Sequence, residues 1–142
     1  MSVVSTAKAH WSGTLPEGSG TTTLVSSGLG TFGTSWKARS EGSGSTTTPE
    51  ELIGAALSTC YSMAMSHALG DKDLVAHSIY VHAKVTFVPG EGITLIRLSV
   101  SADIPGLDAS EFATLAEEVK GACPVSQALA GTTIELEEVS LA

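Results

Sequence analysis

The longest apolar run of the chain lies between Thr48 and Gly70, with no charged residue between Glu51 and Asp71. Its length predicts a helix, and apolar side chains fall on all sides of that helix, so we expect most of its surface to be buried. Thr48 is expected to cap the helix, with Pro49 in the first turn and Glu51 completing a capping box. Gly70 is the expected C-terminal stop.

Segments on both sides of this helix alternate between apolar and polar residues, which is typical of strands with one buried face. The order βββ-α-ββ-αα-β indicates an α+β fold, with antiparallel sheets wrapped around the long central helix. A Gly/Ser loop over 40–47 leads into that helix. The other expected elements are strands over 6–15, 20–27, 31–39, 76–88, 93–104 and 132–140, an amphipathic helix from Asp108 or Ser110 to about Gly121, and a short helix over 124–129.

Length, composition and charge limit the number of domains, the partners and the location that we expect for the chain. The chain has 142 residues, which predicts a single domain over 1–142. Its net charge of −8 and the lack of a basic patch argue against nucleic acid and anionic membranes as partners. The chain begins without an apolar signal-peptide region and contains no transmembrane segment, so a cytoplasmic location is expected. Thiols stay reduced there, so the two cysteines are expected to be free, catalytic or redox-active.

The two cysteines allow two interpretations. Cysteine is among the most buried residue types, so packing in the core accounts for both. Two features favour reactivity instead: polar serine and threonine residues surround Cys60 in the expected apolar helix, and Cys123 precedes Pro124, where a short helix is expected to begin. A thiolate is stabilised at a helix N-terminus, but Cys60 lies in mid-helix and needs a cation to activate it. No cysteine or histidine cluster has the spacing of a metal site, and we expect no cofactor.

Candidate partners for Cys60 are few. The only arginines are Arg39 and Arg97. The simplest interpretation of both is solvent exposure, of Arg97 on the outer face of a strand and of Arg39 at a solvated strand end. His67 shares the helix face of Cys60, where a supporting or core role is expected. Glu50 precedes Cys60 by ten residues, about 15 Å along a helix. The favourable interaction of an acidic side chain with the helix dipole already explains a glutamate in the first turn. Because Glu50 lies too far from Cys60 of its own chain, a catalytic Glu50 requires a second chain and therefore a dimer with composite sites.

Four segments carry a family resemblance: WKARSEG (36–42), TPEELIGAALSTCYSMAMS (48–66), IPGLDASEF (104–112) and CPVSQAL (123–129). Together they resemble the OsmC/Ohr family of thiol-dependent peroxidases, and the EELIGAA form is more similar to the OsmC branch. The resemblance covers essentially the whole chain. It implies an α+β intertwined homodimer with the long helices at its centre and the sheets outside.

The resemblance also implies roles for individual residues. Cys60 matches the peroxidatic cysteine, Cys123 the resolving cysteine, Arg39 the active-site arginine and Glu50 the glutamate that holds it. Tyr61 stands where the family more usually has phenylalanine, and we expect it at the rim of the pocket. The implied substrate is an organic hydroperoxide, and the implied reductant is a dithiol, often a protein-bound lipoyl group in this family.

Two other functions remain open at this point. A non-enzymatic module holding an apolar ligand between central helices needs the cysteines only for packing. A thiol redox sensor uses the same disulfide to change the binding of a partner, without rapid turnover. Reactivity of the native thiols toward peroxide separates these functions from a peroxidase.

Overall fold

A computed structural model of the chain describes residues 1–42 and 44–142. The predicted Gly/Ser loop over 40–47 includes residue 43, which lies outside the described residues. The chain forms two compact units, Met1–Leu52 and Ile53–Ala142. The order of elements is βββ-αα-ββ-αα-β, which confirms the α+β class and adds one helix to the predicted order.

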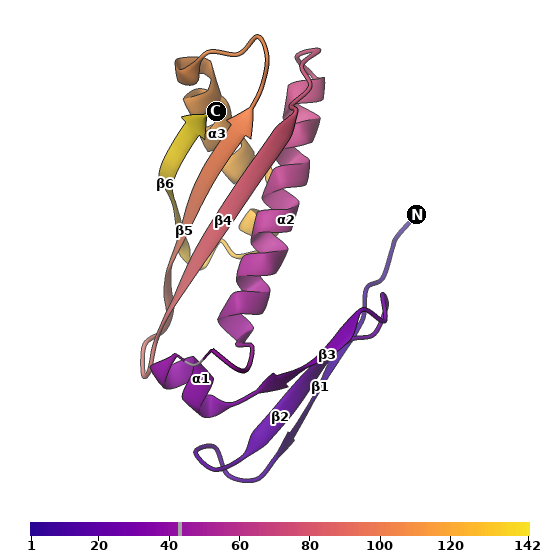
Figure 1. Cartoon of the computed structure of the whole chain (residues 1–142), viewed down its shortest axis with the longest axis vertical. Helices are drawn as coiled ribbons and strands as arrows, with labels where there is room; N and C mark the ends of the chain where they lie inside the picture. The colour runs from indigo at the N-terminus through magenta and orange to yellow at the C-terminus, as the bar shows by residue number, and fades with distance from the viewer. Residues whose placement is uncertain (43) are drawn as a thin grey trace. The chain divides into compact units, whose positions relative to one another are not determined.

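The first unit contains an antiparallel sheet of three strands in chain order, followed by a short helix. Figure 1 shows these strands at the indigo end of the chain. Neighbouring strands are joined by short turns, as predicted. The elements are β1 (Ala7–Ser12), β2 (Ser19–Leu24), β3 (Gly30–Thr34) and α1 (Trp36–Glu41).

The prediction of a strand over 31–39 is wrong beyond Thr34, because Ser35 begins a helix. Its backbone is extended and its hydroxyl accepts a hydrogen bond of 3.1 Å from the Ala38 N–H, as an N-cap does. Gly42 ends α1 with φ of +73°, a conformation that favours glycine. Arg39 therefore lies in the last turn of a helix and not at a strand end.

Helix α2 (Pro49–Gly70) begins in the first unit and continues into the second. It has the predicted bounds and cap, since the Thr48 hydroxyl accepts a hydrogen bond of 3.1 Å from the Glu51 N–H. The Glu51 carboxylate accepts from the Thr47 hydroxyl and not, among the described residues, from the Thr48 N–H, so the predicted capping box is only half formed. Within the part of the chain that the structure describes, no helix is long and apolar enough to cross a membrane.

The second unit contains a mixed sheet in the order β4-β5-β6 (Figure 1). The hairpin of β4 (Ser78–Val88) and β5 (Gly92–Asp103) is antiparallel, as predicted. Strand β6 (Thr133–Leu141) pairs with β5 in parallel, so the prediction of antiparallel sheets is wrong there. A parallel neighbour requires a crossover connection, and α3 (Ala109–Ala122) with α4 (Pro124–Ala128) provides it.

The core of the second unit lies where α2 and α3 meet one face of this sheet. Alternate residues of β5 are buried there, because successive strand side chains point to opposite faces. Helix α2 contributes a single stripe with a spacing of four residues, and Met63 on another face is 67% exposed. Burial of most of the α2 surface is therefore not observed within one chain. The core members are Leu57, Tyr61, Met65, Leu69, Ile96, Leu98, Val100, Ala102, Ile104, Phe112, Leu115, Ala116, Val119 and Cys123.

Tyr61 joins the two helices within this core. Its ring is fully buried, and its hydroxyl donates a hydrogen bond of 2.7 Å to the carbonyl oxygen of Ala116 on α3. Burial raises the pKa of the phenol, with smaller contributions from Glu117 and Cys123, so it remains a neutral donor. The expectation that Tyr61 lies at the rim of a pocket is therefore wrong.

The substitution Tyr61→Phe is expected to lower the free energy of unfolding by about 1 kcal/mol, because it removes this buried hydrogen bond and keeps the ring. Urea unfolding followed by circular dichroism measures the change. Tyr80→Phe is the matched control, since Tyr80 is 72% exposed and the loss of its hydroxyl is expected to change little. Equal effects of the two substitutions would contradict a structural role for the Tyr61 hydroxyl.

Candidate active site

The two cysteines meet although 63 positions separate them. Cys60 lies in the middle of α2, and Cys123 lies between α3 and α4. Their Sγ atoms are 2.9 Å apart, with Cys123 as the hydrogen-bond donor to the Cys60 sulfur, and both thiols are free. The backbone of Cys123 is extended, and Pro124 begins α4 directly after it. This break between the two helices brings the Cys123 sulfur to α2.

Only one of the two sulfurs is accessible. Cys123 is fully buried, whereas Cys60 is partly exposed and lines a cavity of about 680 Å³. The cavity lies between α2 and α3, and most of its wall near Cys60 is apolar. An apolar molecule that enters it therefore reaches Cys60 first. The other lining residues are Met63, Ala64, His67, Ala68, Asp71, Leu115, Glu118, Val119, Ala122 and Pro124.

Arg39 and Glu50 form an ion pair within the first unit. Nη2 of Arg39 lies 2.8 Å from Oε1 of Glu50, and Nε lies 3.0 Å from Oε1 and 3.3 Å from Oε2. Glu50 is only 6% exposed, and the side chain of Arg39 is 33% exposed. The carboxylate thus fixes the plane of the guanidinium, as the resemblance implies, and the interpretation of Arg39 as a solvated strand end is wrong.

Comparison with known proteins places the chain in a family. A family model described as OsmC-like protein matches residues 42–137. The peroxiredoxin OsmC of Escherichia coli strain K12 is 39% identical over 132 residues, covering 91% of this chain and 92% of the relative. The chain belongs to the OsmC-like family. Among solved structures, an organic hydroperoxide resistance protein OsmC from Legionella pneumophila has a TM-score of 0.69 and 25% identity, covering 99% of this chain and 97% of its own.

The fold extends to more distant structures. An OsmC-like protein from Mycoplasma pneumoniae matches with a TM-score of 0.72 over 100% of both chains, at 16% identity. At that identity the likeness concerns the fold alone. The α+β arrangement described above is therefore an OsmC-like fold.

In this OsmC-like cysteine pair the surroundings shift the pKa values of the two thiols in opposite directions. Burial raises the pKa of Cys60, and the hydrogen bond with Cys123 adds to this, with only the Val125 N–H opposing them. Burial also tends to raise the pKa of Cys123, but the hydrogen bond with Cys60, the backbone N–H groups of Ser126 and Val125 and the proximity of the Ser126 hydroxyl outweigh it and lower that pKa. The thiolate is therefore favoured at Cys123, and Cys60 needs additional positive charge to ionise.

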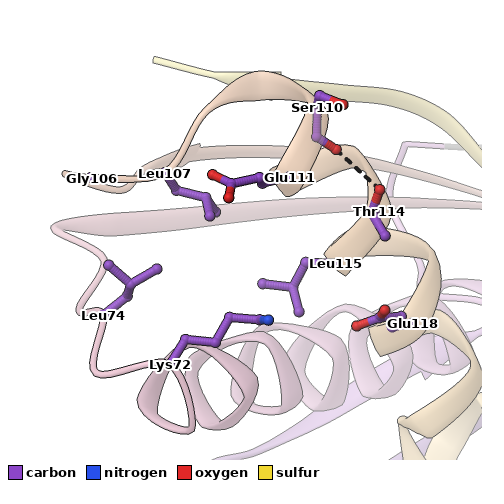
Figure 2. Close-up of a pocket in the computed structure, with 9 residues that line it drawn as sticks. All are labelled: Lys72, Leu74, Gly106, Leu107, Ser110, Glu111, Thr114, Leu115 and Glu118. Atoms are coloured by element: carbon purple, nitrogen blue, oxygen red, sulfur yellow. Dashed lines mark hydrogen bonds between the residues drawn. The ribbon is translucent and has the colours of Figure 1, made fainter.

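A second cavity of the OsmC-like chain has different chemistry. It measures about 470 Å³ and lies between the segment after α2 and the beginning of α3, as Figure 2 shows. Charged and hydroxyl side chains line it, among them Lys72, Glu111 and Glu118, and the Thr114 hydroxyl donates a hydrogen bond of 3.1 Å to the Ser110 carbonyl. No cysteine lines it, so of these two cavities only the one beside Cys60 is suited to thiol chemistry.

Sequence reasoning misplaced one residue near the cysteines and missed another. His67 is largely exposed and lines the cavity of Cys60, so the helix face was predicted correctly but a core position was not. Ser126 was not singled out, although it is buried and lowers the pKa of Cys123. The available signal was its place in the CPVS segment, three residues after the cysteine that precedes a helix.

Proposed function

We propose that this chain is a thiol-dependent peroxidase that reduces organic hydroperoxides to alcohols. The observation that carries the proposal is the pair of free sulfurs 2.9 Å apart, of which only Cys60 is open to an apolar cavity. The Escherichia coli relative that shares 39% identity is named a peroxiredoxin. The apolar wall favours an organic hydroperoxide over hydrogen peroxide, since it stabilises a hydrocarbon group removed from water.

Two bond exchanges complete the oxidative half of the reaction. The Cys60 thiolate attacks the terminal oxygen of the hydroperoxide, the O–O bond breaks, and the organic oxygen leaves as an alcohol after taking a proton. Cys60 is then a sulfenic acid. Cys123 attacks its sulfur, the S–O bond breaks, and the disulfide forms with release of water. This closure protects Cys60 from further oxidation.

An external dithiol then restores both thiols. One sulfur of the dithiol attacks the disulfide to form a mixed disulfide, and its second sulfur releases the protein and closes a new disulfide. We propose a dithiol of the lipoyl type, as in the family. No bound cofactor is required in this scheme, because the reductant is a second substrate.

Arg39 is the proposed activator of Cys60. The raised pKa of Cys60 calls for a cation, and a guanidinium favours the thiolate and binds the peroxide oxygen. The nearly buried Glu50 orients Arg39. Glu50 precedes Cys60 by ten positions on α2, so we propose that the Arg39–Glu50 pair of one protomer serves the partner's Cys60 in an intertwined homodimer.

Exposed apolar residues support this dimer. Met63 on α2 is 67% exposed, and Trp11 on β1 and Phe32 on β3 are 39% and 42% exposed in the single chain. A helix with apolar residues on several faces is usually covered on more than one of them. The proposed dimer, in which residues 1–142 form one OsmC-like domain per protomer, covers these surfaces. We place it in the cytoplasm, with no nucleic acid or membrane as a partner.

The substitution Met63→Lys is expected to shift the dimer toward monomer, because it places a charge on a surface that the partner covers. Sedimentation or size-exclusion chromatography over a dilution series measures the shift, which we expect to exceed 10-fold in the dissociation constant. Met63→Leu keeps an apolar side chain of similar size and is the matched control. A Met63→Lys protein that remains as dimeric as the wild type would contradict the contact at Met63.

The proposed reaction is tested by stoichiometry. The reduced protein is mixed with one equivalent of cumene hydroperoxide, and the free thiols, the disulfide and the alcohol are measured by thiol titration and mass spectrometry. We expect both thiols to disappear, with one Cys60–Cys123 disulfide and one alcohol formed per chain. Thiols that stay reduced in the folded protein and react only after unfolding would instead favour a module that binds an apolar ligand.

A further inference from the structure

One buried hydroxyl beside the cysteine pair has no partner. Ser126 is only 7% exposed, and within residues 1–42 and 44–142 its Oγ atom has no hydrogen-bond partner. Buried polar atoms in folded proteins are nearly always paired, since an unpaired group loses its hydrogen bonds to water without replacement. We therefore expect the Ser126 hydroxyl to gain a hydrogen-bond partner in another state of the protein.

The position of Ser126 identifies that partner as the Cys123 sulfur. Cys123 directly precedes α4, and Ser126 follows it by three residues, so one turn of helix places the serine side chain beside the cysteine. In the thiol form no side-chain bond from Cys123 caps α4. A neutral thiol is a weak acceptor, whereas a thiolate is a charged acceptor that attracts a nearby O–H.

We propose that the Ser126 hydroxyl donates a hydrogen bond to the Cys123 thiolate and thereby accelerates the step in which Cys123 closes the Cys60 sulfenic acid to a disulfide. The inference rests on the proposed function for its place in the reaction. It is consistent with the lowered pKa of Cys123: burial tends to raise that pKa, and the hydrogen bond with Cys60, the Ser126 backbone N–H and the nearby Ser126 hydroxyl lower it. The hydroxyl, which is unpaired in the resting protein, then becomes a hydrogen-bond donor when Cys123 ionises.

The chemistry of the step requires an ionised nucleophile. Cys123 gives up its proton, its sulfur attacks the Cys60 sulfenic sulfur, the S–S bond forms and the S–O bond breaks. Hydroxide leaves and takes up a proton, so the net products are the disulfide and water. Cys123 is oxidised and the sulfenic acid is reduced, and no other oxidant is needed. If this step is slow, a second peroxide oxidises Cys60 to the sulfinic acid.

The first test follows the resolving step in Ser126→Ala. The Cys60 sulfenic acid and the disulfide are quantified by rapid quenching and mass spectrometry after one addition of cumene hydroperoxide, over a range of pH. We expect disulfide formation to slow by about 10-fold at neutral pH, the loss typical of a hydrogen bond to a charged group. The pH profile of this step is expected to shift to higher pH, and Cys60 sulfinic acid to accumulate. The first oxidation of Cys60 is expected to keep its rate.

The melting temperature of the Ser126 variants distinguishes this catalytic support from a structural role of the hydroxyl. Removal of an unpaired buried hydroxyl is expected to leave the melting temperature of Ser126→Ala unchanged or higher, whereas loss of a packing role would lower it. Ser126→Thr, which keeps the hydroxyl, is expected to restore much of the resolving rate. Ser66→Ala, at an exposed position on α2, is the matched control for removal of a hydroxyl. Ser126→Ala protein that closes the disulfide at the wild-type rate with an unchanged pH profile would overturn the proposal.

A second test does not depend on peroxide chemistry. In a Cys60→Ser background Cys123 is the only thiol, and its ionisation is followed by the ultraviolet absorbance of the thiolate. The added Ser126→Ala substitution is expected to raise the pKa of Cys123, because it removes a donor to the charged form. An unchanged pKa would overturn the proposal. A raised pKa in a protein that reacts with no peroxide would uphold the hydrogen bond and reject the proposed function.

Discussion

Replacing Cys60 by serine is expected to abolish peroxide turnover, while replacing Cys123 by serine is expected to permit one oxidation per chain and then stop. Cys60 is the sulfur open to the apolar cavity, and a serine hydroxyl does not form a nucleophile that attacks the O–O bond at neutral pH. Cys123 is fully buried and reaches only the Cys60 sulfur, so its loss removes the closure step alone.

The two variants leave different products. Mass spectrometry after excess cumene hydroperoxide is expected to show no oxidation at position 60 in Cys60→Ser, and sulfenic followed by sulfinic acid at Cys60 in Cys123→Ser. Circular dichroism of both variants serves as the control for folding. Repeated turnover by Cys60→Ser would exclude Cys60 as the cysteine that attacks the peroxide. Turnover by Cys123→Ser at the wild-type rate would exclude Cys123 as the cysteine that closes the disulfide.

Replacing Arg39 by methionine is expected to slow the first oxidation of Cys60 by about 100-fold at neutral pH, the size of effect seen when one preorganised charge-stabilising group is removed. Burial raises the pKa of Cys60, so little thiolate exists there without a cation. A guanidinium near the sulfur lowers this pKa, and its removal raises the pKa again. The rate of the variant is therefore expected to recover as the pH is raised.

Stopped-flow measurement of the first oxidation over a range of pH tests this role. Arg39→Lys keeps the charge but not the planar fork that pairs with Glu50, so an intermediate rate is expected. Lys37→Met removes a positive charge from an exposed position on the same helix, α1, and is the matched control. An Arg39→Met protein that is folded and dimeric and oxidises at the wild-type rate would exclude Arg39 as the activator.

The sequence predicts most of the fold, because most elements carry a strong local signal. The capped apolar run of α2, the alternating hairpin of β4 and β5, and the amphipathic pattern of α3 all have the predicted place. The predicted strand over 31–39 ends at Thr34 in the structure; its continuation was wrong because apolar residues follow Thr34 and the serine cap at Ser35 was overlooked. The parallel pairing of β6 depends on the crossover through α3 and α4, which alternation within a strand does not indicate.

The site is less accessible to sequence reasoning than the fold. Composition and spacing left burial and reactivity open for both cysteines, and only the resemblance paired them. The Arg39–Glu50 contact joins residues on two helices, and the pattern of the chain assigned Arg39 to a strand end. The sequence marks Ser126 only by its place three residues after Cys123, because its importance lies in a buried hydroxyl that has no partner among the described residues. Such features arise from packing between elements rather than from local periodicity.

A steady-state peroxidase assay tests the central claim most directly. The consumption of cumene hydroperoxide and of hydrogen peroxide is followed with a small dithiol as reductant, and again with a lipoyl-type dithiol, for the wild-type protein and Cys60→Ser. We predict rapid consumption of the organic peroxide by the wild type alone, with slower consumption of hydrogen peroxide. A folded, fully reduced wild-type protein that turns over neither peroxide with either dithiol would contradict the account.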